Sequence, residues 1–190
     1  MMKHRKLAFR YGLKTAIVGV GVMLASASPV MSSTDKVSQC NALAGVVNQA
    51  QAFMPVFESS LQTFIDDAEQ VETLDDIKMA ASDYVTAVDE LVINLDTLAI
   101  ELETVQLEDS QLIDYRSQYI TLMEGLSGTL SDASDAMRIM QDVESEVDLP
   151  VKIEESQQLT NDAIQRMQDL SNQEATLISE TNAYCGATGQ

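Results

Sequence analysis

The chain has 190 residues, of which 30 are acidic, 11 are basic and one is histidine, and its formal net charge at pH 7 is −19. This length is typical of one domain with a sizeable core. The excess of negative charge disfavours binding to nucleic acid or to anionic lipid. Five of the basic residues lie within the first 31 positions, so the rest of the chain is still more acidic.

The N-terminal segment has the pattern of a secretory signal peptide. Basic residues precede an apolar run over 15–27, which ends in small residues before Ser28 and Pro29. This run is shorter than the roughly 20 apolar residues of a membrane-spanning helix. We expect a signal peptide over 1–27, a flexible segment over 28–36 and no stable membrane insertion after cleavage. The alternative is an uncleaved anchor.

An exported chain enters an oxidising compartment, which makes the mature protein periplasmic or secreted. Two thiols in such a compartment pair as a disulfide more readily than they bind a metal ion. The sequence therefore predicts a disulfide between Cys40 and Cys185. The alternative is two independent thiols.

Apolar residues recur at alternating spacings of three and four along most of the chain. This period predicts long amphipathic helices with coiled-coil-like packing. The expected bundle domain spans 37–185, with a C-terminal tail over 186–190. Its expected helices cover about 37–69, 74–107, 110–147 and 151–184.

Several residues indicate where these helices begin, bend and end. Thr73 with Asp76 three positions later, and Asp109, are suitable N-terminal caps. Pro55 predicts a kink within the first helix, because its ring disturbs the preceding turn. Pro150 separates the third helix from the fourth.

The short connections predict the topology. Neighbouring helices must run antiparallel, which gives an all-α, up-down-up-down four-helix bundle. The start of the first helix and the end of the fourth then lie at the same end. Cys40 and Cys185 can meet there within the roughly 4.4–6.8 Å Cα separation of a disulfide and clasp the termini.

The sequence excludes several kinds of chemistry. The only histidine, His4, lies in the expected signal peptide. The mature chain thus lacks the imidazole of nucleophile–histidine catalysis, of histidine zinc and di-iron sites, and of haem ligation. Gly125 and Gly128 fall in a helical pattern and not in a phosphate-binding loop, and we expect them to permit close packing or bending. We expect no enzymatic activity and no cofactor, and the one metal ion that the sequence leaves open is weakly bound Ca²⁺.

Acidic residues cluster around the first and third connections, which the predicted topology puts at the same tip of the bundle, opposite the disulfide. Some of them stand near helix ends, where the helix dipole does not favour negative charge. One interpretation is a weak Ca²⁺ site or a contact with a basic protein surface. The other is a solvated end that keeps the protein soluble. The candidate ligands are Asp66, Asp67, Glu69, Glu72, Asp142, Glu144, Glu146 and Asp148.

A second candidate interaction site lies early in the third helix. Tyr115, Arg116 and Tyr119 combine two aromatic rings with a guanidinium group, a combination that is enriched at protein interfaces. The alternative is that the tyrosines pack in the core and only their hydroxyls reach water.

These patterns together predict an exported, non-catalytic helical bundle with a binding or structural role in the cell envelope or outside the cell. Its partner would be a basic protein surface or a second copy of the chain. The alternative is a protein that binds a divalent cation or a small ligand weakly, at the acidic tip or in a cleft between helices.

Overall fold

The computed structural model describes residues 33–186, which form five α-helices. The expected signal peptide lies outside the described residues. The first helix begins within the segment over 28–36 that was expected to be flexible. The helices are α1 (Ser33–Val47), α2 (Ala50–Glu69), α3 (Leu74–Thr104), α4 (Ser110–Gln141) and α5 (Leu149–Cys185).

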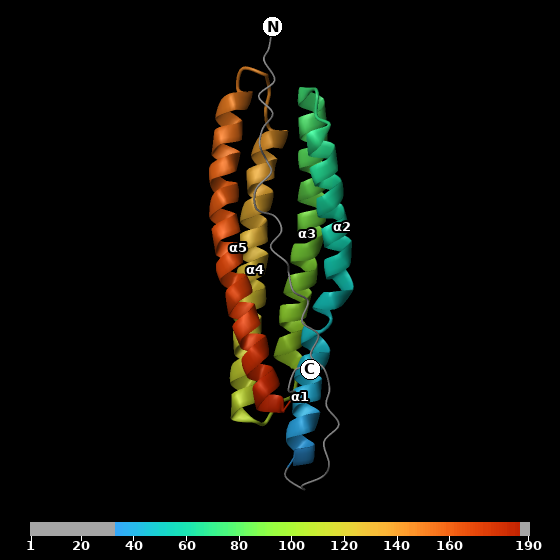
Figure 1. Ribbon diagram of the computed structural model, residues 1–190, viewed down its shortest axis with the longest axis vertical. Coiled ribbons are helices and arrows are strands. Elements are labelled where there is room, and N and C mark those ends of the chain that lie inside the picture. The colour runs from blue at the N-terminus through green and yellow to red at the C-terminus, as the bar shows by residue number, and fades with distance from the viewer. Residues whose placement is uncertain (1–32, 187–190) are drawn as a thin grey trace.

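The helices run up, down, up and down along one long axis, which confirms the predicted four-helix bundle (Figure 1). The most extensive contacts are those of α3 with α4, of α4 with α5 and of α2 with α3. Helix α1 contacts α3, α4 and α5, whereas α2 makes no comparably extensive contact with α4 or α5. The bundle is therefore closed by α1 at one end, and α2 packs mainly along α3. None of the described helices is both long and apolar enough to span a membrane.

The chain divides into α1 and α2 at Asn48–Gln49, so the expectation of one continuous helix over about 37–69 with a kink at Pro55 is wrong. The N–H groups of Gln49, Gln51 and Ala52 donate to carbonyls three residues back, at 2.9–3.1 Å. These bonds tighten the turns between α1 and α2. Pro55 lies inside α2, which continues through it, and it lacks the N–H that would bond to the carbonyl four residues earlier.

The predicted caps are present. At the start of α3 the Asp76 N–H donates to Thr73 Oγ1 at 3.2 Å, and the Thr73 N–H donates to Asp76 Oδ2 at 2.9 Å. This reciprocal pair of bonds is a capping box. Asp109 caps α4. Gly186 ends α5 with φ of 77°, a left-handed conformation that glycine adopts without steric cost.

The connection between α4 and α5 is longer than expected. Helix α4 ends at Gln141 and not near 147, and α5 begins at Leu149. The Ser145 hydroxyl donates to Asp148 Oδ2 at 2.7 Å, and the Asp148 N–H donates to the Ser145 carbonyl at 3.1 Å. This hydrogen-bonded turn replaces the last turns of the expected helix.

Two clusters of buried apolar side chains form the core. The main cluster lies between the helices and includes Leu43, Val88, Leu102, Leu112 and Tyr119, all nearly inaccessible to solvent. A smaller cluster joins the start of α3, the end of α4 and the start of α5, and its buried members are Ala81, Met140 and Val143. The fold thus has a closed end at the disulfide and a second, smaller core at the opposite tip.

Candidate functional site

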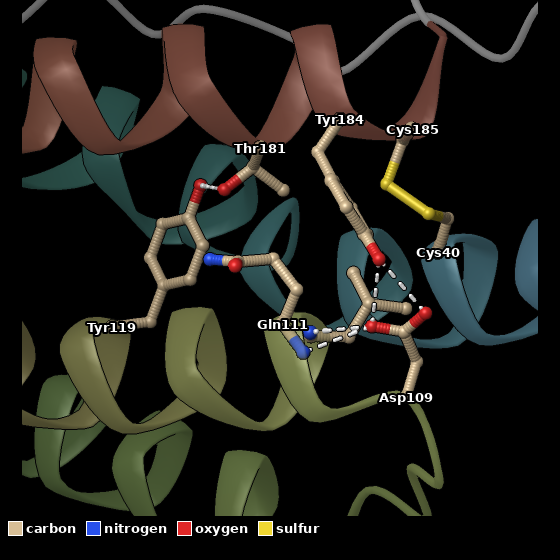
Figure 2. Close-up of a disulfide and its surroundings, with 8 residues drawn as sticks. Cys40, Asp109, Gln111, Tyr119, Thr181, Tyr184 and Cys185 are labelled. Atoms are coloured by element: carbon tan, nitrogen blue, oxygen red, sulfur yellow. Dashed lines mark hydrogen bonds between the residues drawn. A yellow bond between two sulfur atoms is a disulfide. The ribbon is translucent and has the colours of Figure 1, made fainter.

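The predicted disulfide is formed. It joins Cys40 of α1 to Cys185, the last residue of α5, with a Cα–Cα distance of 5.9 Å and a sequence separation of 145 (Figure 2). Three reversals of the chain bring these residues to the same end of the bundle. The disulfide belongs to a group of side chains that connects α1, α4 and α5. We call this group the clasp; it consists of Lys36, Gln39, Cys40, Asp109, Tyr115, Tyr184 and Cys185.

Asp109 is the polar centre of the clasp (Figure 2). Its Oδ1 accepts hydrogen bonds from the N–H groups of Gln111 at 2.9 Å and of Leu112 at 3.1 Å. The Tyr184 hydroxyl lies 3.0 and 2.9 Å from its two carboxylate oxygens and donates to them. Burial raises the pKa of Asp109, but these hydrogen bonds and the charge of Lys36 outweigh burial, and the pKa is lowered overall. One carboxylate thus caps the N-terminus of α4 and accepts a hydrogen bond from the last turn of α5.

The Tyr184 ring contacts two further side chains of the clasp. The Lys36 Nζ lies 3.4 Å from the ring centroid, a cation–π contact from α1. The Tyr115 ring of α4 meets it edge-on, with centroids 5.8 Å apart. The hydrogen bond to Asp109, together with burial, raises the pKa of Tyr184.

Gln39 gives α1 a second anchor in the clasp. Its Oε1 accepts hydrogen bonds from the N–H groups of Glu108 at 2.7 Å and Asp109 at 2.9 Å, in the connection between α3 and α4. Cys40, Lys36 and Gln39 together hold α1 against the rest of the bundle. These polar groups bond to one another, so the arrangement joins the helices at this end of the bundle.

The expected partner face at Tyr115, Arg116 and Tyr119 is wrong, because both tyrosines are in the core. Their exposed fractions are only 7% and 1%. The Tyr119 hydroxyl lies 3.4 Å from the Thr181 hydroxyl of α5, and burial raises its pKa. Arg116 donates through Nη1 to the Val105 carbonyl at 2.7 Å. These side chains fasten α4 to its neighbours and present no aromatic face to solvent.

The predicted acidic tip lies at the end of the bundle opposite the disulfide (Figure 1). All eight candidate ligands are exposed. Within residues 33–186, no three acidic, cysteine or histidine side chains lie close enough together to hold a metal ion. Calcium binding at the tip therefore stays a prediction. Asp66, Asp67 and Glu69 lie at the end of α2, Glu72 lies between α2 and α3, and Asp142, Glu144, Glu146 and Asp148 lie between α4 and α5.

A polar contact between α3 and α4 was not predicted. Asp89 accepts two hydrogen bonds from Arg138 Nη2, at 2.9 and 2.8 Å, and one from the Ser134 hydroxyl at 3.1 Å. Asp96 accepts one from the Ser127 hydroxyl at 2.7 Å. Ser127 and Ser134 are buried between the helices. Periodicity gives no signal for such pairs, because their members are 31 to 49 residues apart.

Glu174 is the acidic residue on the apolar face of α5. Its side chain is half-buried, and burial raises its pKa. It is close enough to Tyr119 for its charge to raise the pKa of that hydroxyl. The described part of the chain shows no hydrogen bond or ion pair to its carboxylate.

An open groove of about 530 Å³ runs along α4 and α5. Ser117, Thr121 and Thr176 line it, but each hydroxyl donates to a carbonyl of its own helix four residues back. The hydroxyls of the groove are thus bonded within their own helices, while Gln118, Asn172, Gln173 and Glu180 add amide and carboxylate groups to its lining.

Comparison with known proteins gives no match to a family model, to a curated protein or to a solved structure. The function is therefore argued from the geometry and charge of this chain.

Proposed function

We propose that the protein is an exported, non-catalytic helical bundle that binds a basic surface of another protein in the cell envelope or outside the cell. The observation that carries the proposal is the surplus of acidic side chains that remains after the internal contacts have formed.

Six basic residues follow the first 31 positions, against 30 acidic residues. Five of the six contact groups within the chain: Lys36, Arg116, Arg138, Lys152 and Arg166. Internal pairing therefore neutralises little of the acidic surface. Such a surface attracts basic partners and speeds their association.

The state of the clasp supports a non-catalytic role. The Asp109 carboxylate already accepts two backbone hydrogen bonds and one from Tyr184. A general base needs a free acceptor next to its substrate. The disulfide is compatible with an oxidising compartment, which an exported protein enters.

Expression of the full chain in its source cell, followed by fractionation and mass spectrometry, tests the proposal. We expect a mature protein that begins at Ser28, found outside the cytoplasm, and a cross-linked adduct with a basic protein. The adduct should be lost when NaCl is raised to about 0.5 M, because salt screens exposed charges. Full-length protein in the cytoplasm, or a mature protein with no adduct at low salt, would contradict the proposal.

A further inference from the structure

The outer face of α3 carries large apolar side chains that no other side chain within residues 33–186 covers. Ile93 and Ile100 are 65% and 62% exposed, and Met79 is 60% exposed. Residues seven apart lie on the same side of a helix, and these three positions follow that spacing together with Thr86. This side is opposite the one by which α3 enters the core through Val88 and its neighbours.

Three threonines extend this apolar face. The hydroxyls of Thr86, Thr97 and Thr104 donate to carbonyls of α3 itself, at 3.0, 2.7 and 2.7 Å. Their hydroxyl protons are thus used within the helix, and their methyl groups add apolar surface. We call the combined surface the outer stripe; it consists of Met79, Thr86, Ile93, Thr97, Ile100 and Thr104.

Acidic residues flank the outer stripe on both sides. At 100° per residue, one flank holds Asp83, Glu90 and Glu101, and the other holds Asp89, Asp96 and Glu103. Asp89 and Asp96 bond to α4, whereas the other four form no ion pair within the described part of the chain. The only basic residue in α3 is Lys78.

The apolar stripe between two rows of acidic residues determines which kind of partner fits. Two copies of the outer stripe would bring their acidic flanks together, which opposes a symmetric dimer. A helix with an apolar seam between two rows of Lys or Arg would cover the stripe and pair with the acids other than Asp89, which Arg138 already holds. We propose that the outer stripe is a docking surface for a basic amphipathic helix of another protein. This inference rests on the proposed function and specifies its surface.

A designed peptide tests the docking surface. The probe is a labelled helix of roughly three heptads with Ile and Leu in the seam and Lys on both flanks. We expect it to bind the mature protein, and the double variant Ile93→Ser/Ile100→Ser to weaken binding on the order of tenfold or more. Both residues are exposed, so the variant keeps the fold, which circular dichroism checks.

The matched control is Val56→Ser/Val151→Ser, which removes two equally exposed apolar side chains from α2 and α5. This control should bind the peptide as the unchanged protein does, and a peptide with Glu on its flanks should not bind. Equal losses in both double variants, or no binding of the Lys peptide, would overturn the docking surface. So would a dimer of the unchanged protein that Ile93→Ser/Ile100→Ser dissociates, because a second copy would then occupy the stripe.

The cross-linking experiment separates this inference from the proposed function. If Ile93→Ser/Ile100→Ser loses the basic adduct, both stand. If the variant keeps the adduct, the protein binds its partner elsewhere and only the docking surface fails. If even the unchanged protein forms no adduct, the proposed function itself fails.

Discussion

At the scale of single residues, the clasp shows how a few polar groups can fix the end of a bundle. Asp109 caps one helix and accepts a hydrogen bond from the last turn of another. Hydrogen bonds to an ionised group are among the stronger ones in proteins. The stability of this end should therefore depend on the charge of Asp109.

Tyr184→Phe removes the hydroxyl that donates to Asp109. We expect a lower melting temperature and a smaller depression of the Asp109 pKa. A lowered carboxyl pKa contributes stability that is present above its usual value of 3.8 and lost as the pH falls through the folded pKa. The variant should thus lose stability mainly at neutral pH, and its melting temperature should fall less on acidification than that of the unchanged protein.

Tyr115→Phe is the control, because the Tyr115 hydroxyl forms no hydrogen bond among the described residues while its ring contacts Tyr184. Melting curves between pH 2 and 7 measure both variants. Equal losses in the two variants would show that the hydroxyl of Tyr184 has no special role.

Glu174→Gln should raise stability at neutral pH, whereas Tyr184→Phe should lower it. Burial raises the Glu174 pKa above its usual 4.5, so its contribution to stability is greatest at low pH and is lost as the pH rises through the folded pKa. The variant should be more stable than the unchanged protein at pH 7. Its gain in stability should be smaller at pH 4. The control is Glu180→Gln, an exposed site on the same helix. Urea unfolding at both pH values measures this, and a stability loss at pH 7 would contradict the interpretation.

The sequence predicted one role of Asp109 in the clasp, the helix cap, and not the other, the hydrogen bond with Tyr184. Asp109 was recognised as a cap because capping is local and depends on the few residues that follow. Its bond to Tyr184 joins residues 75 positions apart. Only the packing of α4 against α5 determines that contact, so no local pattern indicates it.

At the scale of helices, the packing depends on how closely two helices approach each other and on the spacing of their apolar residues. Gly125 and Gly128 stand on the same helix but differ in surroundings. A Cβ at Gly125 would come within 2.9 Å of the Leu170 side chain on α5, whereas a Cβ at Gly128 would meet nothing within 4 Å. The expectation that glycines here permit close packing is therefore correct for Gly125 only.

Gly128→Ala should stabilise the protein by about 0.5–1 kcal/mol, because alanine loses less backbone entropy in a helix. Gly125→Ala should gain less or be destabilising, because Leu170 must move. Urea unfolding of both variants measures the difference. A larger gain at Gly125 than at Gly128 would contradict the close packing of α4 on α5.

Helix ends were harder to predict than helix centres. The apolar spacing located α3 almost completely, because its core side chains follow one uninterrupted phase. The same phase continues through Val143, a loop residue that is buried at the tip, so it extended α4 too far. The turn at Ser145 and Asp148, which ends this pattern, depends on side-chain hydrogen bonds that apolar spacing does not register.

At the scale of the whole molecule, the net charge of −19 opposes compaction. Raising NaCl from about 0.05 to 0.5 M should raise the melting temperature, because salt screens repulsion between exposed acids. Ca²⁺ at about 10 mM, matched in ionic strength with NaCl, tests the acidic tip. We expect equal shifts if the eight carboxylates act only as surface charge, and a larger shift with Ca²⁺ would show a specific site.

Asp66→Asn/Asp142→Asn separates these outcomes, because it removes one tip carboxylate from the end of α2 and one from the connection between α4 and α5. A specific site would lose its extra Ca²⁺ shift in this variant. A melting temperature that falls with added NaCl would contradict the role given to charge repulsion.

The central claim is that the chain reverses three times and that its ends are joined through Cys40 and Cys185. Peptide mapping of unreduced protein after trypsin digestion tests it most directly. Cleavage after Lys36, Lys78 and Arg166 yields a segment over 37–78 with one cysteine and a segment over 167–190 with the other. We predict that the two segments are recovered as one linked species that reduction separates. Recovery of both segments with free thiols, or of two copies of the same segment linked to each other, would contradict the account.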